Sequence, residues 1–207
     1  MKKVIYNKFD KAHIAQLPLV SFPGRIIVII SPGETEKAVD YLLSHSILGF
    51  DTETRPSFHK GENHKVALLQ VATKDTCFLF RLNMTGMTPA IIRLLEDKKV
   101  LKVGLSWHDD LLSLKRRKDF VTGSFVELQN LVREIGVEDM SLQKLYANLF
   151  HQKISKRQQL SNWDRDVLDE KQKLYAATDA WACINLYEEI MWLKETDGYE
   201  LKVETEV

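Results

Sequence analysis

The length, composition and charge of this chain restrict what it can be. Its 207 residues suffice for one domain with a terminal extension, and 44% of them are hydrophobic, an ordinary share for a packed core. Lys and Arg together number 29 and balance the 29 Asp and Glu, which argues against non-specific coating of a nucleic-acid duplex, and no run of about 18 apolar residues predicts a membrane span.

The order of apolar runs and turn residues predicts an α/β domain built on one mixed sheet with helices on both faces. Residues 1–24 are expected to form an N-terminal arm packed on the main domain at 25–195. The acidic tail at 196–207 is expected to be mobile. In chain order, the predicted elements are strand 25–30, helix 34–44, strand 47–54, hairpin strands 66–72 and 76–82, helix 86–97, strand 100–104, helix 107–118, strand 124–126, helices 127–135 and 141–149, and helix 169–194.

The cysteines and the N-terminus bear on the cellular setting. Cys77 and Cys183 make neither a disulfide framework nor a CxxC pair, so each is expected to be a buried thiol. The basic segment at 2–8 is followed by no long apolar run, so no signal peptide is expected. These features predict a reducing, cytoplasmic setting.

Two carboxylates stand at the end of a predicted core strand. Asp51 and Glu53 follow the apolar run 47–50, and residues two apart in a strand point to the same face. Two like charges placed side by side are costly to bury unless a cation lies between them, and a divalent metal with oxygen ligands is the simplest such cation. The alternative is a strand end that enters solvent with both acids hydrated.

A third acid lies in the last predicted helix, where Asp169 and Gln172 form a capping-box-like start. Tyr175 and Asp179 are four residues apart and share one helix face. The residues around them are small or apolar on nearly all sides, which is typical of a buried helix. Asp179 therefore needs a partner, either a metal ion or a structural hydrogen-bond network.

A fourth acid is expected near the start of helix 107–118, which opens with Asp109 and Asp110 directly after strand 100–104. In open α/β sheets, sites form at such strand ends. The alternative is that both acids merely favour the helix N-terminus electrostatically, and one acid for each role also fits.

Taken together, the motifs Phe50-Asp51-Thr52-Glu53, Asp109/Asp110 and Tyr175-x3-Asp179 resemble the DEDD 3′–5′ exonuclease superfamily, tyrosine branch. The sequence is similar to the Werner syndrome-type exonuclease domain and the ribonuclease D catalytic domain from about 25 to 193. The resemblance implies a ribonuclease H-like fold, with the exonuclease domain at 25–195. The histidine branch carries His where this chain has Leu174. The segment between Gly104 and the acid is about one residue longer than in the Werner-type pattern, so Asp109 and Asp110 compete for the role of the fourth acid. We prefer Asp110, because family members often carry Leu four residues after this Asp, and Leu114 stands four residues after Asp110.

The resemblance also implies a two-metal mechanism for phosphodiester hydrolysis, with Mg²⁺ or Mn²⁺ ions about 3.5–4 Å apart. In this hypothesis Asp51 bridges the two ions. Glu53 and Asp179 hold the ion that carries the attacking water, and Asp110 supports the second ion, mainly through its water shell. Tyr175, with an ordinary pKa near ~10, orients the water rather than acting as a base.

Candidates for contact with substrate flank these acids. Thr52 lies between two of them, and Phe58, Trp107 and His108 are flat side chains suited to stacking on terminal bases of a single strand. For Trp107, a position in the core fits equally well. The loop before the last helix supplies cations that are candidates for phosphate contacts: Lys153, Lys156 and Arg157.

The leading hypothesis is therefore a metal-dependent exonuclease acting on a nucleic-acid 3′ end, single-stranded or recessed, with DNA favoured and RNA as the second substrate. One alternative is a nucleic-acid-binding module of the same fold without turnover, which the presence of all the acids and the tyrosine disfavours. The other is a phosphohydrolase acting on small nucleotides.

Overall fold

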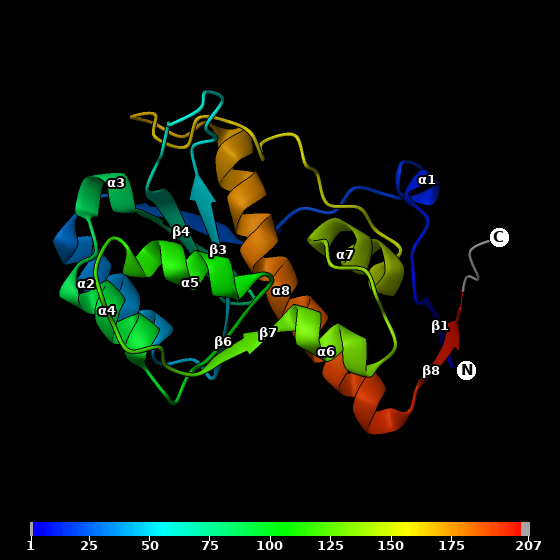
Figure 1. The fold of residues 1–207 in the computed structure, drawn as a ribbon. Coiled ribbons are helices and arrows are strands. Elements are labelled where there is room, and N and C mark those ends of the chain that lie inside the picture. The colour runs from blue at the N-terminus through cyan, green and yellow to red at the C-terminus, as the bar shows by residue number, and fades with distance from the viewer. Residues whose placement is uncertain (1, 204–207) are drawn as a thin grey trace.

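A six-stranded mixed sheet forms the centre of the molecule in the computed structural model, which describes residues 2–203 (Figure 1). Its strand order is β2-β5-β4-β3-β6-β7. The antiparallel pairs are β3–β4 and β4–β5, and the other three pairs are parallel. The strands are β2 (Arg25–Ile29), β3 (Ile47–Thr54), β4 (Val66–Ala72), β5 (Thr76–Arg81), β6 (Leu101–Gly104) and β7 (Phe125–Glu127).

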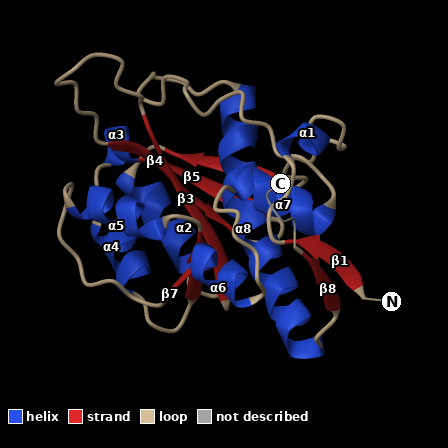
Figure 2. Ribbon diagram, turned by 45° about the vertical axis from the view of Figure 1, so that its right-hand side comes forward, coloured by secondary structure: helices blue, strands red, loops and turns tan. Residues whose placement is uncertain are grey.

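Helices cover both faces of the sheet, which confirms the predicted α/β architecture (Figure 2). One face carries α2 (Pro32–Leu42), α4 (Pro89–Glu96) and α5 (Trp107–Lys115), with the short α3 (Leu82–Thr85) at its edge. The other face carries the long α8 (Glu170–Thr196), against which α6 (Leu128–Glu134) and α7 (Leu142–Phe150) pack.

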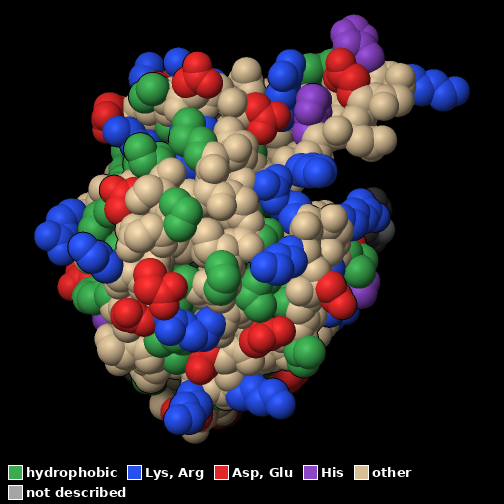
Figure 3. All heavy atoms as spheres, turned by 90° about the vertical axis from the view of Figure 1, so that its left-hand side faces the viewer, with side chains coloured by type: hydrophobic (Ala, Val, Ile, Leu, Met, Phe, Trp, Pro, Cys, Tyr) green, Lys and Arg blue, Asp and Glu red, His purple; other side chains and the backbone are tan. Residues whose placement is uncertain are grey.

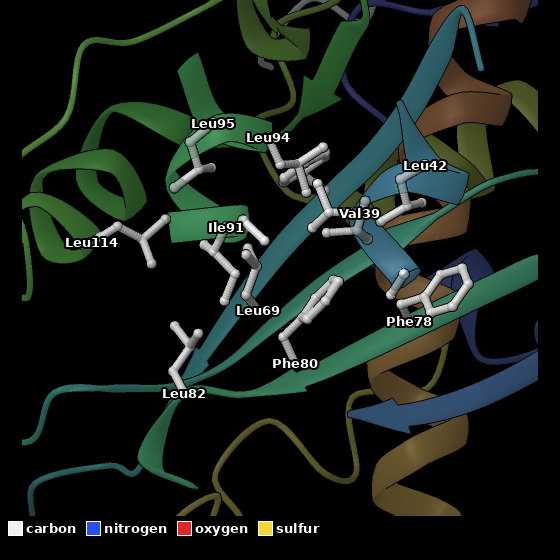
Figure 4. Packing of buried hydrophobic residues seen from close by; sticks show 14 of the residues in the cluster. Val39, Leu42, Leu69, Phe78, Phe80, Leu82, Ile91, Leu94, Leu95 and Leu114 are labelled. Atoms are coloured by element: carbon white, nitrogen blue, oxygen red, sulfur yellow. The ribbon is translucent and has the colours of Figure 1, made fainter. Parts of the chain in front are cut away.

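The alternation of side chains along the strands explains this sandwich. Phe50, Leu69 and Phe80 point toward α2 and α4, where they join Val39 and other buried residues in one apolar cluster (Figure 4). The intervening strand residues, including Leu68, Ala72 and Leu79, face α8. Strands buried on both faces read as continuous apolar runs, which is why β4 and β5 were predictable from sequence.

Helix boundaries follow local capping chemistry. The capping box of α8 is present as predicted, with the Asp169 side chain accepting from the Gln172 backbone N–H. The predicted helix 86–97 begins later, at Pro89, because Gly86 adopts a positive φ of 67° and Thr88 caps the helix instead.

The chain termini meet in a second, two-stranded sheet, which differs from the expected mobile tail. β1 (Lys3–Tyr6) pairs in parallel with β8 (Tyr199–Lys202), and the short α1 (Lys11–Ile14) follows β1. Residues 199–202 are therefore ordered by pairing with the N-terminal arm; 204–207 lie outside the described residues. Two strands this short, paired across nearly the whole length of the chain, leave only a weak signal of strand formation in the local sequence. Within 2–203, no helix has the length and apolarity needed to span a membrane.

Candidate active site

The three carboxylates of Asp51, Glu53 and Asp179 converge at the junction of β3 and α8. Each offers one oxygen, and these oxygens all lie within 4.8 Å of one another. Asp51 and Glu53 share one face of β3, as their spacing predicts, and Asp179 comes from the middle of the buried helix. The structure thus brings Asp179 beside two acids that precede it by 126 or more residues in the sequence.

A close approach between backbones makes this convergence possible. Gly49 lies two residues before Asp51 on the face of β3 that meets α8, and a Cβ added there would stand 2.0 Å from the carbonyl oxygen of Ala180. No other residue type leaves room for the helix at this distance. Glycine at position 49 therefore lets α8 pack closely enough on β3 to place Asp179 beside the β3 acids.

Asp110 joins the cluster from the first turn of α5. Its Oδ1 accepts a hydrogen bond of 2.5 Å from the hydroxyl of Thr52, which lies between the two β3 acids. Asp109 is exposed on the same turn. The geometry therefore places Asp110, rather than Asp109, beside the other acids.

Burial and the mutual repulsion of the acids dominate the electrostatics of the cluster. Burial, followed by the charges of Asp179 and Asp110, raises the pKa of Asp51 well above its usual range. Burial and the charge of Asp51 raise the pKa of Glu53 to about 10. Negative charge is thus strongly disfavoured at these positions unless a cation accompanies it.

The other two acids are perturbed in the same direction for the same main reason. Burial raises the pKa of Asp179 to about 7, although hydrogen bonding from Tyr175 and the charge of Lys156 oppose the shift. Burial raises the pKa of Asp110 to about 6, against the opposing hydrogen bond from Thr52. Burial and the charge of Asp179 also raise the pKa of the Tyr175 hydroxyl, so Tyr175 stays protonated at neutral pH.

These side chains fit a divalent metal. Oδ1 of Asp179 is buried and has no hydrogen-bond partner among the described residues. The available ligands are carboxylate oxygens, which hard cations such as Mg²⁺ and Mn²⁺ prefer. Asp51, Glu53 and Asp179 are therefore the residues that could hold such an ion, with Asp110 adjoining them.

A cleft with a volume of about 360 Å³ opens onto these acids. Thr52, Tyr175 and Lys156 are among its lining residues, together with Leu142 and Gln143 from the start of α7. On the face of the molecule drawn in Figure 3, a segment with His side chains and with Lys or Arg side chains projects over a notch, where further Lys and Arg side chains gather. A cleft lined by these acids and by the cation Lys156 suits a phosphate ester.

Comparison with known proteins identifies the family. The family model for the 3′–5′ exonuclease domain matches residues 27–193. The chain belongs to the 3′–5′ exonuclease family. It is 32% identical over 190 residues to the mouse protein "Bifunctional 3′-5′ exonuclease/ATP-dependent helicase WRN", covering 87% of this chain and 14% of that protein. It is 27% identical over 177 residues to the human "Exonuclease mut-7 homolog", covering 71% of this chain and 20% of that protein. The chain thus spans less than a third of these relatives.

Two solved structures share the fold. The Nibbler EXO domain of Aedes aegypti matches with a TM-score of 0.75 and 21% identity, covering 92% of this chain and 93% of that one. RNase D of Escherichia coli matches with a TM-score of 0.75 and 16% identity, covering 84% of this chain and 46% of that one. The exonuclease fold implied by the sequence motifs is thereby confirmed.

The structure separates the substrate-contact candidates of this exonuclease domain. Thr52 lines the acid cleft, Phe58 is 72% exposed on the loop after β3, and His108 is exposed in the first turn of α5. Trp107 is only 3% exposed and packs against Phe50 and Phe125. It is a core residue, which corrects its placement among residues that stack on a base.

The cations of the loop before α8 also take different positions. Lys156 lines the acid cleft, whereas Arg157 lines a neighbouring hollow beyond it. Lys153 donates to the backbone carbonyl of Ala15 and so holds the N-terminal arm. Sequence alone could not rank these three, because a polar loop carries no periodicity that fixes side-chain direction.

The role of Glu127 at the site was not predicted from the sequence. The Glu127 carboxylate accepts hydrogen bonds from the backbone N–H groups of Ser106 at 3.0 Å and Trp107 at 2.7 Å. It therefore caps the helix that carries Asp110, from a strand 20 residues away. In the sequence, Glu127 stands at the predicted start of helix 127–135, directly after the brief strand 124–126, and that position does not reveal which helix its carboxylate caps.

Proposed function

We propose that this chain is a metal-dependent 3′–5′ exonuclease that hydrolyses phosphodiester bonds at the 3′ end of a nucleic acid. The observation that carries the proposal is the convergence of Asp51, Glu53 and Asp179, with Glu53 and Asp179 buried, in a cleft of a domain from the 3′–5′ exonuclease family, where the charge of Lys156 does not cancel the raised pKa of Asp179. A module that only binds nucleic acid has no need of a buried acid cluster that opposes the negative charge of its ligand.

The metal chemistry would rest on four acids. Asp51, Glu53 and Asp179 would hold Mg²⁺ or Mn²⁺, and Asp110 would support the bound metal. Bound divalent ions supply a nucleophile at neutral pH and stabilise charge on the leaving 3′ oxygen. Thr52 holds Asp110 in place through its hydroxyl, so the fourth acid is fixed before any ion binds.

The remaining residues would orient the reactants. The protonated Tyr175 hydroxyl lies beside Asp179 and would direct the attacking water by donating or accepting a hydrogen bond. Lys156 at the cleft wall would contact a phosphate, and its charge already acts on Asp179. Phe58 and His108, both exposed near the acids in sequence, would stack on the terminal base.

We favour DNA and keep RNA as the second substrate to test, since the solved E. coli relative is described as an exoribonuclease. The expected compartment is cytoplasmic and reducing, in agreement with two buried free thiols, Cys77 and Cys183.

A single assay tests the proposal. The protein is given 5′-labelled single-stranded DNA, 3′-recessed DNA and RNA, with Mn²⁺, with Mg²⁺ and with EDTA. We expect stepwise shortening from the 3′ end only when metal is present. Asp179→Asn should abolish it, whereas Glu195→Gln, which alters an exposed acid on the same helix, should leave it intact.

Two results would overturn the proposal. Binding of the strands without shortening would favour the module without turnover. Inertness toward polymers together with hydrolysis of mononucleotides would favour the small-nucleotide phosphohydrolase.

A further inference from the structure

A second hollow lies on the other side of the loop segment 154–157 from the acid cleft. Its volume is about 220 Å³. Tyr175 and Ile154 line both the hollow and the cleft, so the two are neighbours separated by one stretch of chain. The hollow and the cleft therefore adjoin each other.

The walls of the hollow are fixed by backbone hydrogen bonds. The Val20 N–H donates to the Lys153 carbonyl at 3.0 Å, and the Lys153 N–H donates to the Pro18 carbonyl at 2.9 Å. The Phe22 N–H donates to the hydroxyl of Thr178 in α8 at 3.0 Å. The N-terminal arm is thereby tied both to the loop and to α8, and it forms one side of a preformed groove.

The floor of the groove is apolar and open to solvent. Leu19 of the arm is 63% exposed and Leu174 of α8 is 38% exposed. Both line the hollow, together with the half-buried Val20 of the arm. Exposed aliphatic side chains that line one hollow favour an apolar ligand group.

The rim of the groove is cationic. Arg157 and Lys171 line it, and neither makes an ion pair with any residue between 2 and 203. The nearby acids are already engaged, Asp169 by Arg165 and Glu170 by Lys173. Lys156, equally without an ion pair in the described chain, continues this cationic line into the acid cleft.

We propose that this groove binds an internal nucleotide of the strand whose 3′ end occupies the acid cleft. The base would lie on Leu19 and Leu174, and Arg157 and Lys171 would contact the flanking phosphates. The proposal rests on the proposed exonuclease function for the direction of the strand. Alternating apolar and anionic groups are the chemistry of a single strand, and they match an apolar floor with unpaired cations at its rim.

Binding of oligonucleotides of increasing length tests the groove. Fluorescence anisotropy is measured in Ca²⁺ with a dinucleotide, a hexamer and a dodecamer of single-stranded DNA, and a gel checks that each strand stays intact. The wild type should bind the longer strands more tightly than the dinucleotide. The double variant Arg157→Ala/Lys171→Ala should lose this gain and bind the dinucleotide as the wild type does.

The salt dependence sharpens the test. Because each phosphate contact on a single strand contributes roughly 0.7 to the slope of log affinity against log salt, removal of two contacts should lower the dodecamer slope by about 1.4. The matched control is Lys98→Ala/Lys99→Ala, which removes the same charge from a hollow beside α4. The control should keep the slope.

Two outcomes would overturn the groove proposal while leaving the exonuclease function standing. One is unchanged dodecamer binding in the double variant, which would leave the groove to another occupant such as an acidic peptide. The other is an equal loss at every length, which would place these cations at the terminal nucleotide. Conversely, a length effect that depends on Arg157 and Lys171 in a protein that never shortens its strand would support the groove and refute the proposed turnover.

Discussion

Gly49 of β3 and Ala180 of α8 meet backbone to backbone, and a Cβ on Gly49 would lie 2.0 Å from the Ala180 carbonyl oxygen. Gly49 precedes Asp51 by two residues, and Ala180 directly follows Asp179. The packing distance between sheet and helix therefore sets the separation of the acids. The same contact serves the stability of the fold and the geometry of the site.

Replacing Gly49 by Ala should lower the stability of the fold and disturb the geometry of the acid site. The added methyl group can only be accommodated if α8 moves away from β3, since the obstacle is backbone, and overpacking of this kind costs roughly 1–3 kcal/mol. We expect a lower free energy of unfolding in urea and a higher Mn²⁺ concentration for half-maximal nuclease activity.

The matched control is Gly33→Ala in α2, where an added Cβ meets nothing within 4 Å. Helical Ala is favoured over Gly, so this variant should be as stable as the wild type or more stable by roughly 0.5–1 kcal/mol. Wild-type stability and metal dependence in Gly49→Ala would show that the contact does not set the site.

The neighbouring acids of α5 should respond differently to loss of charge. Asp110 accepts from Thr52 and its pKa is raised by burial, whereas Asp109 is exposed. We expect Asp110→Asn to lower the rate of 3′ shortening by about 100-fold or more, as expected for loss of an acid that supports a catalytic ion. Asp109→Asn should keep most of the wild-type rate. The reverse order in the same gel assay would mean that Asp109 is the fourth acid.

The stability of the metal-free protein should fall as pH rises. Asp179 titrates near 7 in the folded state against an ordinary pKa of 3.8, and Glu53 near 10 against 4.5, so the folded protein binds more protons than the unfolded chain between these limits. The stabilisation from these two groups is then fully present below about pH 4 and is lost as pH rises, at roughly 2–3 kcal/mol per pH unit between pH 5 and 7.

Thermal melts in EDTA from pH 5 to 8 measure this effect. The Tm should decline across the range, and saturating Mg²⁺ or Mn²⁺ should remove most of the decline because metal binding requires ionised ligands. Asp179→Asn should flatten the curve in EDTA. A Tm in EDTA that rises through this range would show that the acids are ionised and compensated without metal.

Much of this site was readable in the sequence because its residues sit on regular elements. The spacing of Asp51 and Glu53 predicts one strand face, and the small residues around Asp179 predict a buried helix; both expectations match the observed placement. The approach of β3 to α8 was not readable, because a glycine in a strand gives no sign of which element approaches it.

The features that sequence reasoning missed depend on contacts between distant segments. For Trp107 the sequence left a stacking residue and a core residue equally open, and the helix start turns its indole into the core beside Phe50. The strand β8 forms only because β1 lies beside it, 196 residues earlier in register. Such pairings follow from tertiary packing and leave no local periodicity.

Glu127 should control the position of Asp110 without touching the other acids. Its carboxylate accepts from the N–H groups of Ser106 and Trp107, and also from the N–H of Gln129 at 3.0 Å. Ser106 holds a left-handed φ of 61°, so the start of α5 depends on this clamp. In Glu127→Gln one acceptor oxygen becomes an amide donor that faces a backbone N–H, at a cost of roughly 1–3 kcal/mol.

We expect Glu127→Gln to lower both the Tm and the rate of 3′ shortening, with the rate restored in part by raised Mn²⁺ because the acid ligands remain. Glu134→Gln, which alters an exposed acid of α6 paired with Lys194, should change neither quantity appreciably. A purely structural role would lower the Tm but leave the Mn²⁺ dependence of the residual activity as in the wild type. A shifted Mn²⁺ dependence therefore separates a residue that positions Asp110 from one that only stabilises the helix.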